Sequence, residues 1–342
     1  MTLPLDTVGM FDLAAALPEQ VAAAVDLGAA VEGLPAHDDI ENVVVLGMGG
    51  SGIAGDVIAA VAGPFMPVPV TVVKGYEAPS SVGDGTLCFA ISCSGNTEET
   101  VEAAQEAAVA GARMVVLSAG GELAELARSW GAPHIQLPDV PMPRAAIGSV
   151  SIPPLIVLEQ VGLFPGARQY VADAVTQLSS RRDKLIMEGS TAHQLAAKID
   201  RTMPVAYGGG ALGEAAAYRF KCQVNENAKA PAFSAGVPEM CHNEICGWGQ
   251  HGDVTRQVMT VVRFRHDFEH PQISRRFDYT FDIHDEVVHD VVDVVAEGDG
   301  PLAQLFDLVI QGDFTSLHMA AEAGVDPGPI PVLVALKEAL AR

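Results

Sequence analysis

The chain has 342 residues, and at roughly 150 residues per domain this length predicts two domains. It carries 43 acidic residues against 20 lysines and arginines, a formal net charge of −23. Because so acidic a chain repels the phosphate backbone of nucleic acids and anionic lipid, we expect neither as a partner. Hydrophobic residues make up 49% of the sequence and charged residues 18%, which excludes disorder as the dominant state.

Three features of the sequence bear on the cellular location of the protein: its first residues, the length of its apolar runs and its cysteines. Residues 1–25 lack a basic stretch, and no run of roughly 18 apolar residues occurs, so we expect neither a signal peptide nor a transmembrane helix. The five cysteines are an odd number, which fits reduced thiols in the cytoplasm better than a disulfide framework. Cys241, His242 and Cys246 cluster but lack the paired spacing of structural zinc sites, and we predict no metal.

The first half of the chain alternates short apolar runs with helical segments. After an alanine-rich helical segment (1–40), strands are expected at residues 42–46, 68–73, 87–91, 113–117 and 134–137. Helices are expected at residues 53–62, from about 98 onward, and at 122–130. Fully apolar strands that alternate with helices predict βαβ units around a parallel sheet.

The second half repeats this layout. Helices are expected at residues 155–163, 170–197, 214–224, 301–310 and 315–323, and strands at 203–207, 258–264 and 291–295. A strand, a glycine loop and a helix follow one another around Gly47 and again around Gly208. The repeat predicts two similar α/β domains, at residues 41–154 and, with linker helices, at 155–342.

A glycine-rich loop follows the first expected strand. Residues 47–52 (Gly-Met-Gly-Gly-Ser-Gly) match the G-x-G-x-x-G pattern of dinucleotide-binding folds. That fold also requires an acidic residue at the end of the second strand, where this sequence has Lys74. The loop could instead present backbone amides to another anion at a helix N-terminus, or it could be no more than a tight turn.

A second polar loop follows the third expected strand. Ser92, Ser94 and Thr97 place hydroxyls at the start of a helix, where free amides and the helix dipole favour negative charge. Together with Ser51 they could surround a phosphate monoester. The same hydroxyls could merely cap the helix, since two glutamates follow Thr97. Because the two loops follow adjacent strands of one parallel sheet, a phosphate site is favoured.

Two other segments carry reactive side chains. Arg144 stands between a Pro-x-Pro sequence and small residues, a setting that suits either a fixed catalytic cation or a salt bridge at a domain boundary. Residues 225–244 contain Glu226 and His242 among prolines and apolar residues. A carboxylate together with an imidazole can provide the base and the acid for proton abstraction next to a carbonyl.

These motifs together resemble a known family, the bifunctional phosphoglucose/phosphomannose isomerases, from about residue 40 to the C-terminus. The matching stretches are Gly-Met-Gly-Gly-Ser-Gly (47–52), Ser-Cys-Ser-Gly-Asn-Thr-Glu-Glu-Thr (92–100), Pro-Arg-Ala-Ala-Ile-Gly (143–148), Asn-Glu-Asn-Ala-Lys (225–229) and Pro-Glu-Met-Cys-His-Asn-Glu-Ile (238–245). The resemblance implies an α/β protein of two three-layer αβα sugar-isomerase (SIS) domains, each with a mostly parallel central sheet. It also implies an aldose–ketose isomerase without metal or cofactor.

The resemblance further assigns roles to individual residues. Phosphate would be held by residues of the two loops, namely Gly50, Ser51, Ser92, Ser94 and Thr97. Glu226 would move a proton between C1 and C2 of glucose 6-phosphate or mannose 6-phosphate, giving fructose 6-phosphate through a cis-enediol. Arg144 would stabilise the developing negative charge. Lys337 would assist ring opening, as would His242, which in this family comes from the neighbouring subunit of a homodimer.

Two positions depart from the family pattern. His318 stands where an aromatic pair is usual, and Gly328 stands where threonine is common, so tolerance of both sugar epimers does not follow. A non-catalytic sugar-phosphate sensor is therefore an alternative, although no basic or helix-turn-helix output segment accompanies the SIS motifs. An NAD-dependent oxidoreductase is a third hypothesis, which rests on the glycine pattern alone.

Overall fold

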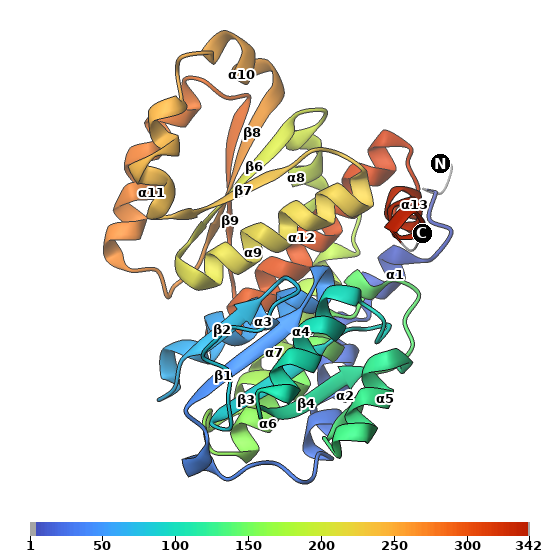
Figure 1. Ribbon diagram of the computed structural model, residues 1–342. Coiled ribbons are helices and arrows are strands. Elements are labelled where there is room, and N and C mark those ends of the chain that lie inside the picture. Colours follow the sequence, from blue (N-terminus) through green and yellow to red (C-terminus); the bar gives the residue numbers. More distant parts are fainter. Residues whose placement is uncertain (1–4, 341–342) are drawn as a thin grey trace. The chain divides into compact units, whose positions relative to one another are not determined.

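The computed structural model describes residues 5–340, which divide into two compact units. The unit named here the first comprises residues 16–180 and 297–307, and the second comprises 5–15, 181–296 and 308–340 (Figure 1). The outer ends of the expected segments 1–40 and 155–342 lie outside the described residues. Within residues 5–340, no helix combines the length and apolar character needed to cross a membrane.

The first unit is built on a five-stranded parallel sheet in the order β2-β1-β3-β4-β5. Nearly every side chain of its central strands is buried, as expected for a parallel sheet covered on both faces. The expected strands are confirmed to within two residues: β1 (Asn42–Gly47), β2 (Val70–Val73), β3 (Thr86–Ile91), β4 (Arg113–Ser118) and β5 (His134–Gln136).

Helices cover both faces of this sheet. Helix α6 (Ile147–Gln160) packs against α2 (Leu17–Ala29) and against α3 (Gly49–Val61), which places these three helices together. Helices α4 (Glu98–Val109) and α5 (Gly121–Trp130) contact each other and the central strands. Because β2 lies on one side of β1 and the later strands on the other, right-handed crossovers put these two groups on opposite faces.

The second unit repeats the pattern with four parallel strands in the order β7-β6-β8-β9. The strands are β6 (Met203–Gly209), β7 (Phe233–Val237), β8 (Met259–Arg265) and β9 (Asp290–Val295). Its helices are α1 (Met10–Ala15), α8 (Thr191–Ile199), α9 (Gly210–Gln223), α10 (Gly252–Val258), α11 (Pro271–Asp285) and α13 (Pro331–Leu340). The expectation of an α/β protein with two parallel sheets is confirmed.

Several expected helix boundaries are wrong. The helix expected at 170–197 is two, α7 (Ala167–Leu185) and α8, because Ser190 starts a new helix by accepting a hydrogen bond from the His193 backbone N–H at 3.3 Å. The helices expected at 301–310 and 315–323 form one continuous helix, α12 (Pro301–Ala323). The helix expected from residue 155 begins at Ile147 and includes two prolines. Strand β7 and helices α10 and α11 were not anticipated.

The packing of α2 against α6 gives a stability prediction. A Cβ on Gly28 would lie 2.7 Å from the Pro153 carbonyl oxygen, so Gly28→Ala must push the two helices apart. We expect a loss of about 1–3 kcal/mol in the free energy of unfolding, which exceeds the gain in helix propensity. Gly63→Ala is the control, since nothing lies within 4 Å of its Cβ position. Equal urea denaturation midpoints for the two variants would contradict this packing.

Candidate active site

The glycine loop after β1 runs directly into α3 and orients Ser51. Gly49 adopts φ +53°, a left-handed conformation that glycine accommodates without strain. Ser51 is buried, and its hydroxyl accepts a hydrogen bond from the Cys93 backbone N–H at 3.3 Å. Ser51 therefore joins the carboxyl ends of β1 and β3, in the first turn of a helix whose amides favour an anion.

The hydroxyls of the loop after β3 bond to one another instead of capping α4. The Ser92 and Thr97 hydroxyl oxygens lie 2.8 Å apart, and the Ser92 hydroxyl also accepts from the Gly95 N–H at 3.1 Å. Thr97 precedes α4 but makes no side-chain capping bond to it. Ser94 is exposed at the loop tip. The alternative in which the Thr97 side chain only caps the helix is therefore wrong, and the hydroxyls of Ser92 and Thr97 lie together in this loop.

Arg144 is fixed against the same glycine loop. It is only 3% exposed, and its Cα would lie 3.2 Å from a Cβ on Gly50, so the backbones approach closely because Gly50 has no side chain. Gln20 holds this segment from α2: its amide donates to the Ala145 carbonyl at 2.9 Å and its oxygen accepts from the Gly148 N–H at 2.6 Å. These backbone contacts thus hold the Arg144 segment against the glycine loop that carries Ser51.

Sequence reasoning overlooked two supporting residues of the first unit, Gln20 and Cys93, and noted Lys74 only as a non-acidic residue after the second strand. Lys74 ends β2, and its Cε lies 3.2 Å from the Cβ position of Gly52, at the first turn of α3. Its ammonium pairs with Asp56 at 2.5 Å. Burial raises the pKa of the Asp56 carboxyl, an effect that Lys74 opposes. A cation therefore stands where a dinucleotide fold would place its ribose-binding acid.

In the second unit, Glu226 lies on a π-helical turn, Val224–Ala228, that continues α9. The turn ends at Lys229, which adopts φ +57° and donates from its ammonium to the carbonyls of Glu226 (2.5 Å) and Pro327 (3.1 Å). The Asn227 amide is buried and donates to the Ser316 hydroxyl at 2.9 Å. These contacts on both sides of Glu226 hold its backbone in an uncommon conformation, which is often found at functional sites.

A buried ion pair anchors the helices beneath this turn. Arg219 on α9 donates to both carboxylate oxygens of Asp313 on α12, at 3.0 and 2.6 Å. The Ser316 hydroxyl that receives Asn227 itself donates to the Asp313 carbonyl at 2.7 Å. The pair therefore sets the register of α9 against α12, and with it the position of Glu226.

His242 lies in a short helical turn, Glu239–His242, and its side chain is exposed. Two residues later, the Glu244 carboxylate accepts a hydrogen bond from the buried Tyr207 hydroxyl, which in turn accepts from Trp248 Nε1 at 3.1 Å. Burial and the Glu244 charge raise the pKa of Tyr207, so its hydroxyl stays a donor. No local sequence pattern indicates that Tyr207 holds the His242 segment to β6.

Lys337 lies on α13, all of whose residues are exposed. The structure thus places Gly50, Ser51, Ser92, Thr97 and Arg144 at the carboxyl ends of the first sheet, and Glu226 and His242 on segments that follow α9 and β7 of the second unit. Among residues 5–340, no group of three or more His, Cys, Asp or Glu side chains is arranged to hold a metal ion.

Comparisons with known proteins agree with this arrangement. Residues 39–158 match the SIS domain, and residues 188–340 match the bacterial phospho-glucose isomerase C-terminal SIS domain. A bifunctional phosphoglucose/phosphomannose isomerase of Caldicellulosiruptor bescii is 33% identical over 97% of this chain and 99% of its own. The chain belongs to the bifunctional phosphoglucose/phosphomannose isomerase family. Membership in this family leaves the glycine pattern without support as a dinucleotide site.

Other similarities are broader. A D-glucosamine-6-phosphate 4-epimerase of Sulfolobus acidocaldarius is 32% identical over 62% of this chain and 65% of its own. The C-terminal domain of glucosamine-fructose-6-phosphate aminotransferase from Francisella tularensis superposes with a TM-score of 0.71 at 15% identity, covering 94% of this chain and 98% of that one. At that identity the superposition shows the fold alone, two SIS-type units.

The two departures from the family pattern are accommodated by packing. The His318 ring stacks on His193, with centroids 4.9 Å apart, and meets the edge of Phe11 at 5.3 Å, so it still acts as an aromatic residue. Burial and His193 lower the pKa of His318 to about 4, which keeps the ring neutral. A Cβ on Gly328 would lie 2.4 Å from the Val8 side chain, which leaves room for glycine only.

A buried histidine under the His242 segment gives a pH prediction. His284 is fully buried against Tyr207 and Trp248, and neither ring nitrogen has a hydrogen-bond partner. Burial, with Arg263 nearby, lowers its pKa to about 4. Because the unfolded chain protonates this histidine near pH 6.5 and the folded chain only near pH 4, the free energy of unfolding falls as pH drops through that window.

We therefore expect His284→Phe to remove part of the acid sensitivity. The difference in the free energy of unfolding between pH 7 and pH 5 should shrink by about 2 kcal/mol relative to wild type. Urea denaturation at the two pH values measures it. A difference that stays as large as in wild type would mean that His284 is already protonated in the folded protein.

Proposed function

We propose that this protein interconverts glucose 6-phosphate, mannose 6-phosphate or both with fructose 6-phosphate. The observation that carries the proposal is Glu226, a carboxylate held by Asn227 and Lys229 on an uncommon helical turn in a member of this isomerase family. The hydroxyls of the first unit supply a site for the substrate's phosphate.

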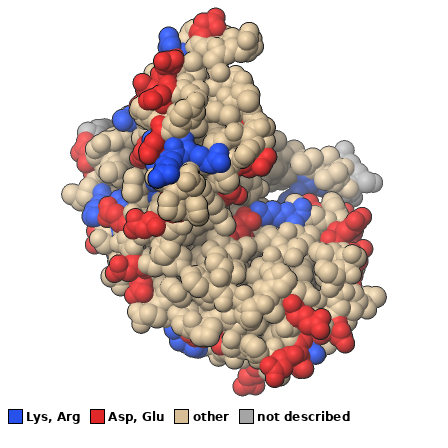
Figure 2. Space-filling model, turned by 90° about the vertical axis from the view of Figure 1, so that its left-hand side faces the viewer, with Lys and Arg blue, Asp and Glu red and all other residues tan. Residues whose placement is uncertain are grey.

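Phosphate binding needs no cluster of lysines. Backbone amides at a helix N-terminus and short hydroxyls bind a monoester directly. We assign this role to Gly50, Ser51, Ser92, Ser94 and Thr97. Acidic side chains are scattered over the face drawn in Figure 2, where Lys and Arg form only small clusters, so binding depends on these local donors and not on the net charge of −23.

The isomerisation follows from one proton transfer in each direction. Glu226 takes the proton from C2 of the open-chain aldose, the electron pair left on C2 forms the C1–C2 double bond, and the carbonyl oxygen takes up a proton to give the cis-enediol. Return of the proton to C1, with loss of the proton from the C2 hydroxyl, gives the ketose, so the proton gained at O1 balances the one released from O2. The oxidation at C2 and the reduction at C1 balance within the substrate, so no external redox cofactor is required. Arg144 stabilises negative charge on the enediolate oxygens.

Ring opening precedes this step, and we assign it to His242 and Lys337. In the second unit both residues are exposed, and α13 also exposes large apolar side chains, including Val332 (78%) and Leu340 (67%). Exposed apolar area on a short helix favours an interface with a second chain. We therefore propose a homodimer in which His242 acts on the sugar bound by its partner. A cytoplasmic role in carbohydrate metabolism is consistent with this activity.

Replacing the proposed base tests the function. Glu226→Gln keeps the size of the side chain but cannot accept a proton, so we expect kcat to fall by about 10²–10⁴-fold or more on both aldoses. A coupled assay for fructose 6-phosphate measures the rate. Exchange of solvent deuterium into fructose 6-phosphate should be lost in the same variant.

The deuterium readout separates the alternatives. A wild-type protein that binds fructose 6-phosphate without exchanging its proton would be a sensor, and wild-type activity in Glu226→Gln would mean that Glu226 is not the base. A 4-epimerase acting on D-glucosamine 6-phosphate would give a different product, which NMR of the reaction mixture identifies.

Mixing two inactive variants tests the shared site. Glu226→Gln and His242→Asn should each be inactive alone. After unfolding and refolding together in equal amounts, we expect about a quarter of wild-type activity, since half of the dimers are mixed and each mixed dimer holds one intact site. Activity that stays at the level of the single variants would place Glu226 and His242 of one site on one chain.

A further inference from the structure

The second sheet contains a counterpart of the phosphate loops of the first. In the two sheets Gly47 pairs with Ile91 and Gly208 pairs with Phe264, so β6 corresponds to β1 and β8 to β3. Gly210 adopts φ +60°, close to the +53° of Gly49. The segment between β8 and α11, residues 266–270, therefore occupies the place that the Ser92–Thr97 loop has in the first unit.

The phosphate-binding hydroxyls are missing from this counterpart. Leu212 stands where the first unit has Ser51, and Arg265 stands where it has Ser92, by the same strand register. His270 takes the place of Thr97 in front of the helix, and its ring nitrogen accepts from the Gln272 N–H at 3.1 Å. The second unit thus keeps the left-handed glycine after the strand and the position of both loops, but not their side-chain donors.

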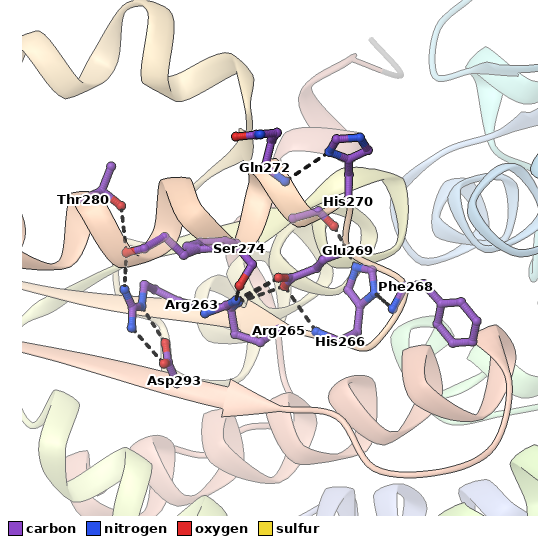
Figure 3. A network of polar contacts seen from close by, with 12 residues as sticks. Arg263, Arg265, His266, Phe268, Glu269, His270, Gln272, Ser274, Thr280 and Asp293 are labelled. Carbon is purple, nitrogen blue, oxygen red and sulfur yellow. Dashed lines mark hydrogen bonds and ion pairs between the residues drawn. The ribbon is translucent and has the colours of Figure 1, made fainter.

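A carboxylate of the protein itself lies at these loops. The Glu269 side chain is 5% exposed, and Arg265 donates to it from Nε (2.9 and 3.1 Å) and from Nη2 (2.9 Å), as Figure 3 shows. The His266 backbone N–H also donates to Glu269 at 3.3 Å. A Cβ on Gly209 would lie 3.1 Å from the same carboxylate, which places it against the glycine loop.

His266 ties the two loops together around this carboxylate. Its Nδ1 accepts from the Phe268 N–H at 3.1 Å (Figure 3). Its Nε2 therefore carries the proton and donates to the Gly209 carbonyl at 2.7 Å. Burial lowers the pKa of His266, which keeps this neutral form. An anion is therefore bound by a guanidinium and a backbone amide between the glycine loop and residues 266–270, and the anion is Glu269.

We propose that Glu269 is an internal anion that fills the second unit's counterpart of the phosphate site, with Arg265 as its counter-ion. Each chain then binds a single sugar phosphate, at Ser51 and Ser92; this part rests on the proposed function. Removal of the Glu269 carboxylate leaves a guanidinium and a free amide facing a vacated space. That space becomes an anion site.

Counting bound inorganic phosphate tests the proposal in the full chain. Calorimetric titration should show one more phosphate per chain in Glu269→Ala than in wild type. The additional site should disappear in the double variant Glu269→Ala/Arg265→Met. Because the comparison is a difference between variants, its result does not depend on whether the wild-type protein is an isomerase.

Asp293→Ala is the matched control. Asp293 is also paired with an arginine, Arg263 on β8, at 2.5 and 2.8 Å, but the pair does not touch the glycine loop. Its removal should add no phosphate site. The same stoichiometry in Glu269→Ala and wild type, or a gain in Asp293→Ala, would overturn the proposal.

If Glu269→Ala is too poorly folded for calorimetric titration, the effect of phosphate on thermal unfolding provides a second test. Phosphate should raise the Tm of Glu269→Ala, and of Glu269→Ser, more than potassium chloride of equal ionic strength does, and by a larger increment than in wild type. Wild type should show only the increment of the phosphate that binds at Ser51 and Ser92. Variants whose Tm responds to phosphate no more than that of wild type would contradict the internal-anion role.

Discussion

In both units the end of a strand crosses the first turn of the helix that follows it, and the two backbones pack so closely that no side chain fits between them. The rest of the structure depends on this crossing. A Cβ on Gly52 would lie 2.7 Å from the Gly47 carbonyl oxygen, and one on Gly208 would lie 2.0 Å from the Gly213 carbonyl oxygen. The crossing brings the first turn of α3, and likewise of α9, against the end of its own strand. In a parallel sheet all strand ends of this kind meet at one edge, so the residues that bind anions collect there.

The same crossing has two different outcomes in the two units. In the first, the hydroxyls of Ser51 and Ser92 lie at the strand ends, where we propose that phosphate binds, and the Arg144 backbone approaches because Gly50 has no Cβ. In the second, Glu269 and Arg265 fill the equivalent place. The two units thus share the same close contact between strand and helix, and their side chains determine whether the place beside it is left for an external anion or is filled by the protein itself.

The acid–base half of the proposed mechanism depends on buried polar contacts rather than on apolar packing. The pair of Arg219 and Asp313 is almost completely buried, and removing one partner of such a pair costs about 3–5 kcal/mol, because a charge is left alone. The ion pair aligns α9 with α12. Hydrogen bonds of Ser316 and Asn227 connect this aligned pair of helices to the turn that contains Glu226.

The errors in the expected helices have physical causes. Residues 311–314 read as a break because Gly312 and Asp313 disfavour a helix, yet Gly312 packs against Phe220 and Asp313 pairs with Arg219, so tertiary contacts override propensity. Strand β7 escaped notice because its five residues, Phe-Ser-Ala-Gly-Val, lack a β-branched run. The start of α8 was a local signal that could have been found, since Ser190 is a favoured capping residue.

The sequence by itself determined the fold class and the family and suggested the candidate reactive side chains, because strand–helix alternation and the glycine and hydroxyl loops are local patterns. Only the tertiary structure decided that Thr97 bonds to Ser92 instead of capping α4, that Gln20 holds the segment of Arg144, and that Tyr207 holds that of His242. It alone placed Glu269 against the second glycine loop. These contacts join residues that strand pairing brings close together, so no local sequence pattern predicts them.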